Sequence, residues 1–173
     1  WLPFLIPVGA IFNGAFELPI SNYGFDWRLP QESSIDVGFV VRPVRSVGGN
    51  GQRSLYVEFT GRKLRSQIAS QWLAAEPGRY AFAGAVRSEA LKSIAGVRWS
   101  FRCGAAGGKV IATSERIVGS SEWHPFSGDV VIPDGCDAQQ LLLEPASAEE
   151  ALIGLTGRVW YDDLTLRRIG PVR

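Results

Sequence analysis

The 173-residue sequence contains no methionine, one histidine and two cysteines, and these shortages exclude several kinds of site. A single imidazole, His124, excludes most zinc arrangements, and no Cys-x-x-Cys pair occurs. No apolar run approaches the roughly 18 residues that a membrane-spanning helix needs. The basic residues are mostly arginine, with 15 Arg against 3 Lys. The net charge of +1 gives no reason to expect a nucleic-acid partner. We therefore expect neither nucleic-acid binding nor membrane insertion.

The chain opens on an apolar segment that prolines interrupt, without the basic leader of a signal peptide. We expect residues 1–10 to be a linker or an extended segment and, because methionine is absent, the chain to be a fragment. The apolar content of 46% with 11% aromatic residues is that of a globular protein. We expect residues 11–170 to form one domain.

Short alternating segments separated by Gly, Pro, Asn and Asp dominate the chain, which is typical of a sandwich or barrel. In the clearest segment, 97–103, apolar residues and Cys103 alternate with Arg98, Ser100 and Arg102. Similar strands are expected at 55–60, 80–87, 110–112, 130–132, 139–144 and 159–166. Only 145–155 is predicted to be helical, for a turn or two, with Ser147 and Glu150 at capping-box spacing.

The two ends of the chain carry a more specific pattern. Asn-Gly-x-Phe-Glu stands at 13–17, Gly-Phe-Asp-Trp at 24–27, Pro-Gly-x-Tyr at 77–80, and Tyr-Asp-Asp-Leu-x-Leu at 161–166. These motifs resemble the galactose-binding-like jelly rolls, which include carbohydrate-binding modules of the family 4, 9 and 22 type. The resemblance covers nearly the whole chain and implies an all-β jelly-roll β-sandwich of two antiparallel sheets. More narrowly, segments 96–99 and 133–139 resemble domains attached to bacterial tetratricopeptide-repeat envelope proteins.

The resemblance also implies a structural calcium ion that ties the two ends together. Its ligands would be Glu17 with Asp162 or Asp163, helped by backbone carbonyls. If Leu164 and Leu166 point inward, Asp162 points inward too, and a buried carboxylate needs a cation or donors. The alternative is that Asp162 accepts backbone N–H bonds, or pairs with an Arg, without metal.

The two cysteines are either a disulfide in an oxidising compartment or two unrelated buried thiols. In the architecture that the resemblance implies, the strands that carry Cys103 and Cys136 can be neighbours. We therefore expect a disulfide, and a periplasmic or extracellular location.

Modules of this kind bind sugars on a sheet face or at a rim, through aromatic rings and polar side chains. Outward positions of the expected central strands form a polar face that includes Glu144, although a solvated sheet would look the same. Trp99 and Trp160 are expected in the core, and Trp123 on a loop. The candidate ligand-binding residues are Gln71, Trp72, Arg87, Arg98, Arg102, Trp123 and Gln140.

The sequence gives little support to catalysis, because its paired carboxylates are adjacent and diverge on a strand. We expect a non-catalytic carbohydrate-binding module of a larger envelope or secreted protein. Its partners would be a glycan and the rest of its parent chain. The alternative is a protein-interaction or spacer domain without a sugar site. Two exposed aromatic rings beside a groove would favour sugar binding, and a flat sheet without aromatic residues would favour the alternative.

Overall fold

The computed structural model describes residues 10–30, 37–46, 48, 51–104 and 108–173. Residues 1–9, most of the expected linker, lie outside the described residues. In the described part, all-β structure is confirmed, with nine strands and one short helix. These are β1 (Phe39–Arg45), β2 (Arg53–Thr60), β3 (Ala69–Leu73), β4 (Gly78–Lys92), β5 (Val97–Cys103), β6 (Val110–Thr113), β7 (Gly119–Ile132), β8 (Gln139–Pro145), α1 (Ala148–Ile153) and β9 (Thr156–Gly170).

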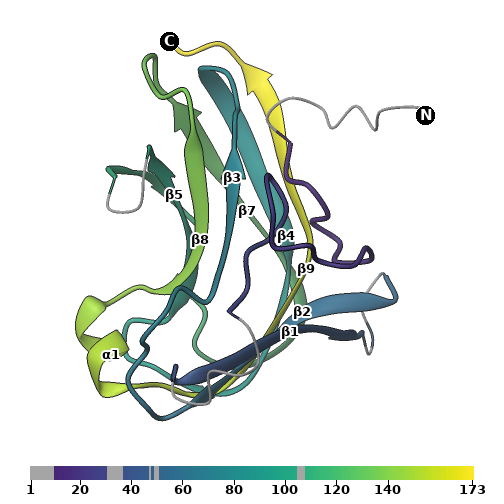
Figure 1. The fold of residues 1–173 in the computed structure, drawn as a ribbon, viewed down its shortest axis with the longest axis vertical. Coiled ribbons are helices and arrows are strands. Elements are labelled where there is room, and N and C mark those ends of the chain that lie inside the picture. Colours follow the sequence, from purple (N-terminus) through teal and green to yellow (C-terminus); the bar gives the residue numbers. More distant parts are fainter. Residues whose placement is uncertain (1–9, 31–36, 47, 49–50, 105–107) are drawn as a thin grey trace.

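The strands form two antiparallel sheets, a five-stranded sheet of order β1-β2-β9-β4-β7 and a four-stranded sheet of order β3-β8-β5-β6. Figure 1 shows the two sheets as layers, with β3, β8 and β5 in one and β4, β7 and β9 in the other. From β3 onward the chain passes repeatedly from one sheet to the other, and only β5 and β6 are successive strands of one sheet. This repeated crossing is the connectivity of a jelly roll.

Aromatic side chains from both sheets meet in the core between them. Trp99 of β5 packs edge-on against Tyr161 of β9 with ring centroids 5.3 Å apart. Phe82 of β4 makes a similar contact, at 5.0 Å, with Phe101 of β5. All four side chains are almost fully buried. They therefore mark the faces of β4, β5 and β9 that pack inward, since side chains alternate between the two faces of a strand.

The segment 10–30 closes one side of the sandwich and lies beside β9 and β4 in Figure 1. Its Phe16 and Trp27 side chains are fully buried, and the Trp27 ring lies 5.5 Å from that of Trp99. Arg28 exchanges two backbone hydrogen bonds, of 2.8 and 3.1 Å, with Ser70 on the free edge of β3. The segment therefore adds core residues and also covers an edge that would otherwise expose unpaired backbone groups.

Two of the expectations for the tryptophans are wrong. Trp160 is only half-buried: it lies on the outer face of the five-stranded sheet, where its ring centroid is 4.8 Å from the Arg87 guanidinium and 5.3 Å from the Tyr56 ring. Trp123 is not on a loop, because β7 begins at Gly119. Pro125 is tolerated inside β7 because this strand lies at the edge of its sheet.

Candidate functional site

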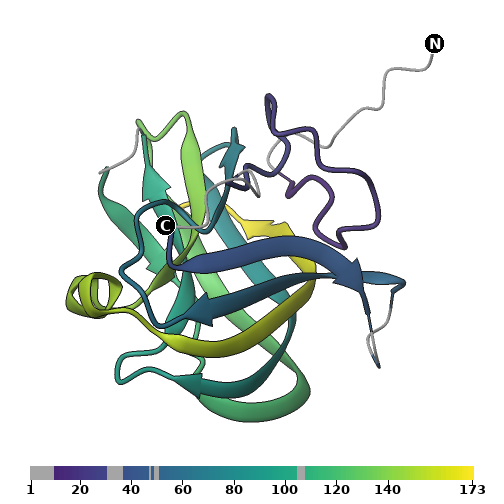
Figure 2. The ribbon, with the colours of Figure 1, turned by 60° about the horizontal axis from the view of Figure 1, so that its bottom comes forward.

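An open groove of about 670 Å³ lies on the outer face of the four-stranded sheet, and we call it the sheet groove. Its floor is formed by β5 and β8, through Arg98, Arg102, Leu142 and Glu144. One wall is residues 64–68, which lead into β3, and the other is residues 145–148 with Ala151. In Figure 2, α1 stands at the left of the view and marks the position of this second wall.

The register of β5 and β8 explains why these floor residues share a face. Arg98 stands opposite Glu144, Ser100 opposite Leu142, and Arg102 opposite Gln140. Their neighbours Trp99, Leu141 and Leu143 point into the core, so the floor residues must point away from it.

Several polar atoms of this face are buried without a hydrogen-bond partner. They are Nε of Arg98, Oγ of Ser100 and Oε1 of Gln140. Ser100 is fully buried and Gln140 is 4% exposed, so neighbouring side chains shield their polar atoms from water. These atoms cost free energy where they lie, and those of Ser100 and Gln140 stand beneath the groove surface and not on it.

Arg102 and Glu144 form an ion pair on this floor, at 3.0 Å, with both side chains about one-quarter exposed. The Nη2 atom of Arg102 donates to both carboxylate oxygens of Glu144, at 3.0 and 3.2 Å. This pair fixes two charged side chains on the floor, which gives the groove a defined polar surface.

A buried carboxylate holds the α1 wall in place. The N-cap Ser147 accepts the N–H of Glu150, as the capping-box spacing predicts. The Glu150 carboxylate, however, turns to the β4–β5 turn, where it accepts from Ser93 Oγ and from the N–H groups of Ile94 and Ala95. Burial opposes its ionisation, but these hydrogen bonds outweigh burial and lower the pKa of Glu150. The charge thus ties the helix to the sandwich.

The structure brings together four of the seven candidate ligand-binding residues. Trp72 stands opposite Gln140, so Trp72, Gln140 and Arg102 form one row across the outer face of the four-stranded sheet. Arg98 lies two residues before Ser100 on the same face. Trp72 is half-buried and belongs to the row next to the groove.

The other three candidates lie elsewhere. Arg87 belongs to β4 and Trp123 to β7, both in the five-stranded sheet. Gln71 is fully buried and pairs with the core residue Leu141. Its amide accepts from the N–H of Phe12 at 2.9 Å and donates to the Phe12 carbonyl at 2.8 Å, so Gln71 anchors the N-terminal segment.

Sequence reasoning missed the walls of the groove. Arg65, Ser66 and Ser147 line it, yet they lie in irregular segments without the alternation that identifies a strand face. Glu144 was recognisable as an outward residue by alternation alone, and only its ion pair shows its place in the site.

The three residues predicted to bind calcium lie where the N-terminal segment meets β9. Asp162 is 1% exposed; its Oδ1 accepts the N–H of Asp163, and its Oδ2 has no partner. Burial raises the pKa of Asp162 to about 6, and the charges of Asp163 and Glu17 add to the effect. Glu17 accepts backbone N–H groups of Gln52 and Arg53 at 2.7 and 2.9 Å.

The side chains of these residues do not by themselves make up a metal site. Among the described residues, no group of three or more His, Cys, Asp or Glu side chains is arranged to hold a metal ion. The orphaned Oδ2 of Asp162 nevertheless fits a cation, because a buried anionic oxygen without donors is costly. Backbone carbonyls would have to supply the remaining ligands.

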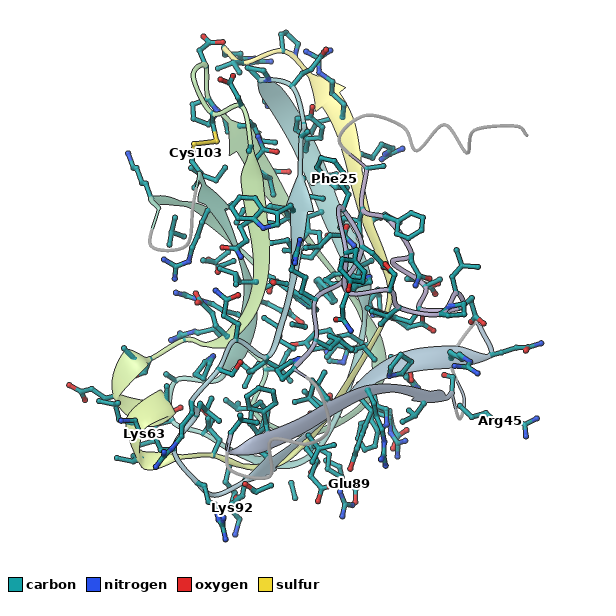
Figure 3. The ribbon with its side chains drawn as sticks, in the orientation of Figure 1. Phe25, Arg45, Lys63, Glu89, Lys92 and Cys103 are labelled. Atoms are coloured by element: carbon teal, nitrogen blue, oxygen red, sulfur yellow. A yellow bond between two sulfur atoms is a disulfide. The ribbon has the colours of Figure 1, made fainter. Side chains whose placement is uncertain are left out.

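The cysteines form the expected disulfide, between Cys103 at the end of β5 and Cys136 before β8. It lies at the end of the four-stranded sheet remote from α1, as Figure 3 shows at Cys103. It therefore joins the ends of β5 and β8, the strands that form the groove floor.

The sequence matches no protein-family model and no curated protein sequence. Solved structures do match. A carbohydrate-binding module of family 4 is 16% identical with a TM-score of 0.64, covering 92% of this chain and 99% of its own.

Two further matches share this architecture. The CBM22-1 xylan-binding domain of Paenibacillus barcinonensis Xyn10C is 14% identical, with a TM-score of 0.58 over 95% of this chain and 98% of its own. A family 16 carbohydrate-binding module is 18% identical, with a TM-score of 0.55 over 90% and 97%. At these identities the likeness establishes the fold, which is the jelly roll of these modules. No helix among the described residues is long and apolar enough to cross a membrane.

Proposed function

We propose that the chain is a non-catalytic carbohydrate-binding domain whose ligand lies in the sheet groove. The observation that carries the proposal is the polar lining of the groove, where the side chains of Arg65, Ser66, Gln67 and Arg98 offer hydrogen-bonding groups. A saccharide presents closely spaced hydroxyls that both donate and accept hydrogen bonds, so it can satisfy such groups.

The fold supports the same proposal. The three matched structures named above are carbohydrate-binding modules, and one is described as xylan-binding. Fold alone does not determine function, but here a polar groove accompanies the fold. A non-catalytic role agrees with the groove floor, because its one carboxylate, Glu144, is engaged by Arg102. A glycoside hydrolase ordinarily needs a pair of carboxyl groups.

The setting of the domain is part of the proposal. A disulfide of this kind persists in oxidising compartments, which supports an extracellular or periplasmic location. We propose that the chain serves a larger secreted or envelope protein, of the tetratricopeptide-repeat type that its sequence resembles, by holding a glycan near that protein.

A protein-interaction or spacer domain is the second candidate, and one observation favours it. Among the described residues that line the groove, none is aromatic, so the groove lacks the rings that commonly stack on sugars. The face is not flat, however, and charged and polar side chains line its groove.

A glycan array that spans neutral and acidic polysaccharides tests the proposal. We expect binding that Ser66→Val weakens, because Ser66 is an exposed residue of the groove wall and the change leaves the hydroxyl of a bound sugar without its partner. Thr165→Val, an exposed position on the outer face of β9, is the matched control and should bind like the unchanged protein. An array without a single hit would favour the spacer.

We also propose a structural calcium ion held by Asp162 and Glu17 with backbone carbonyls. When bound it would neutralise the buried carboxylate and tie the N-terminal segment to β9. Asp163 follows Asp162 at a β-bulge in β9, where its φ of 53° is left-handed. This bulge turns Asp162 inward directly after the buried Tyr161.

A further inference from the structure

We infer that the sheet groove selects saccharides that carry a carboxylate, of the hexuronate class, and that Arg98 recognises this carboxylate. The inference rests on the proposed function, because it names the ligand class of the same groove. Three observations support it: the excess of arginine over carboxylate in the described lining, the position of Arg98, and the lack of aromatic side chains among the described lining residues.

The charge of the lining is unbalanced. Of the described residues that line the groove, Arg65, Arg98 and Arg102 are cations and Glu144 alone is a carboxylate. Glu144 is held by Arg102 through both of its oxygens, so this carboxylate is already matched. Among the described lining residues, two cations therefore remain without a carboxylate partner, which favours an anionic ligand.

Arg98 is the residue whose need for an acceptor is most specific. It stands directly opposite Glu144 in the β5–β8 register, yet the Glu144 carboxylate pairs diagonally with Arg102 instead. The Nε of Arg98 is buried and has no hydrogen-bond partner. A guanidinium offers Nε and Nη donors in a planar fork that matches the two oxygens of a carboxylate. Arg98 lines the groove, so a uronate carboxylate bound there would give its guanidinium a partner.

The lining also argues against recognition by stacking. Neutral polysaccharides are commonly held by aromatic rings against the C–H faces of the sugar. No described lining residue is aromatic, and Trp72 stands in the adjacent row on β3. Charge-assisted hydrogen bonds are the stronger interaction that this lining can offer, with Ser66 and Gln67 of the groove wall as partners for hydroxyls.

The test uses two uronate polymers, polygalacturonate and alginate, each as the free acid and as its methyl ester, with neutral xylan alongside. Esterification removes the carboxylate charge and leaves the sugar backbone unchanged. Titration calorimetry on the full chain should show binding of at least one free acid. The ester of the same polymer should bind at least about tenfold more weakly.

Three variants locate the effect. Arg98→Gln should raise the dissociation constant for the free acid about tenfold or more. Arg98→Lys should also weaken binding, because it keeps the charge but loses the planar fork. Arg167→Gln removes an exposed cation from β9 of the other sheet and should stay within about twofold, as expected for a distant surface charge. Melting temperatures close to that of the unchanged protein show that each variant is folded.

Every other outcome overturns the inference. If the acids and their esters bind equally, or only xylan binds, the groove holds sugars without selecting carboxylates, and the proposed function stands. If no polymer binds, the proposed function fails as well. If Arg98→Gln and Arg167→Gln weaken binding equally, the attraction is one of overall charge and not of this groove.

Discussion

The Arg102 guanidinium lies 3.0 Å from the Glu144 carboxylate, although the residue directly opposite Glu144 across the β5–β8 ladder is Arg98. One diagonal ion pair therefore decides which of two arginines on the same face is neutralised. Arg102 is matched within the protein, and Arg98 keeps a buried Nε without a partner. The polarity of the sheet groove depends on this choice.

Glu144→Gln is expected to strengthen the binding of uronate polymers by about three- to tenfold, because it removes the only carboxylate among the described lining residues and frees Arg102. The same change should lower the free energy of unfolding by less than about 1 kcal/mol, since the ion pair is partly exposed to solvent. Calorimetric titration and urea unfolding measure the two effects. Weaker binding of the acids would mean that Glu144 itself holds the ligand.

The disulfide is expected to contribute about 3–4 kcal/mol to the free energy of unfolding, as the chain-entropy model gives for a loop that Cys103 and Cys136 close over 33 residues. Replacing both cysteines with alanine should remove this amount in guanidinium unfolding. A reductant should destabilise the unchanged protein and leave the double variant unaffected. Equal stability of the two proteins without reductant would contradict the prediction.

Gly14→Ala tests why the Asn-Gly-x-Phe-Glu motif needs its glycine. A Cβ on Gly14 would lie 1.9 Å from the carbonyl oxygen of Leu164, while the Gly14 carbonyl accepts the Leu164 N–H. We expect a loss of about 1–3 kcal/mol in the free energy of unfolding, the usual cost of overpacking. Gly128→Ala is the control, because nothing lies within 4 Å of its Cβ position. A similar small change in both variants would count against the close contact.

In the absence of calcium, the stability of the protein is expected to depend on the ionisation of Asp162. Burial raises the pKa of this carboxyl from its ordinary 3.8 to about 6, so between these values the folded state holds a proton that the unfolded state has released. The free energy of unfolding should therefore fall as the pH rises through about 6, by on the order of 2 kcal/mol. Urea unfolding at pH 4.5 and pH 7.5 with a chelator measures the fall, and Asp162→Asn should reduce it. An unchanged pH dependence in this variant would assign the effect to another group.

Calcium should reverse this behaviour. A bound cation stabilises the ionised carboxylate, so at pH 7.5 added calcium is expected to raise the melting temperature and a chelator to lower it. Asp162→Asn should make the melting temperature insensitive to both. If neither calcium nor a chelator moves the melting temperature of the unchanged protein, Asp162 is accommodated without a metal.

The sequence by itself determined the facing of the strands, because side chains alternate with a period of two wherever a strand is half-buried. Arg98 and Arg102 were recognisable as outward residues, as was Glu144, and Trp99 as a core residue, from local pattern alone. The capping role of Ser147 also follows from local spacing.

Only the tertiary structure decided which sheet each strand joins, because strand pairing is set by contacts between residues far apart in the sequence. Arg87 and Arg98 look alike in sequence, yet they lie on different sheets. Gln71 is buried, and its amide holds the backbone of Phe12 beside β3, the edge strand of its sheet. The diagonal pairing of Arg102 with Glu144, and with it the unpartnered Nε of Arg98, depends on geometry across two strands that no local pattern encodes.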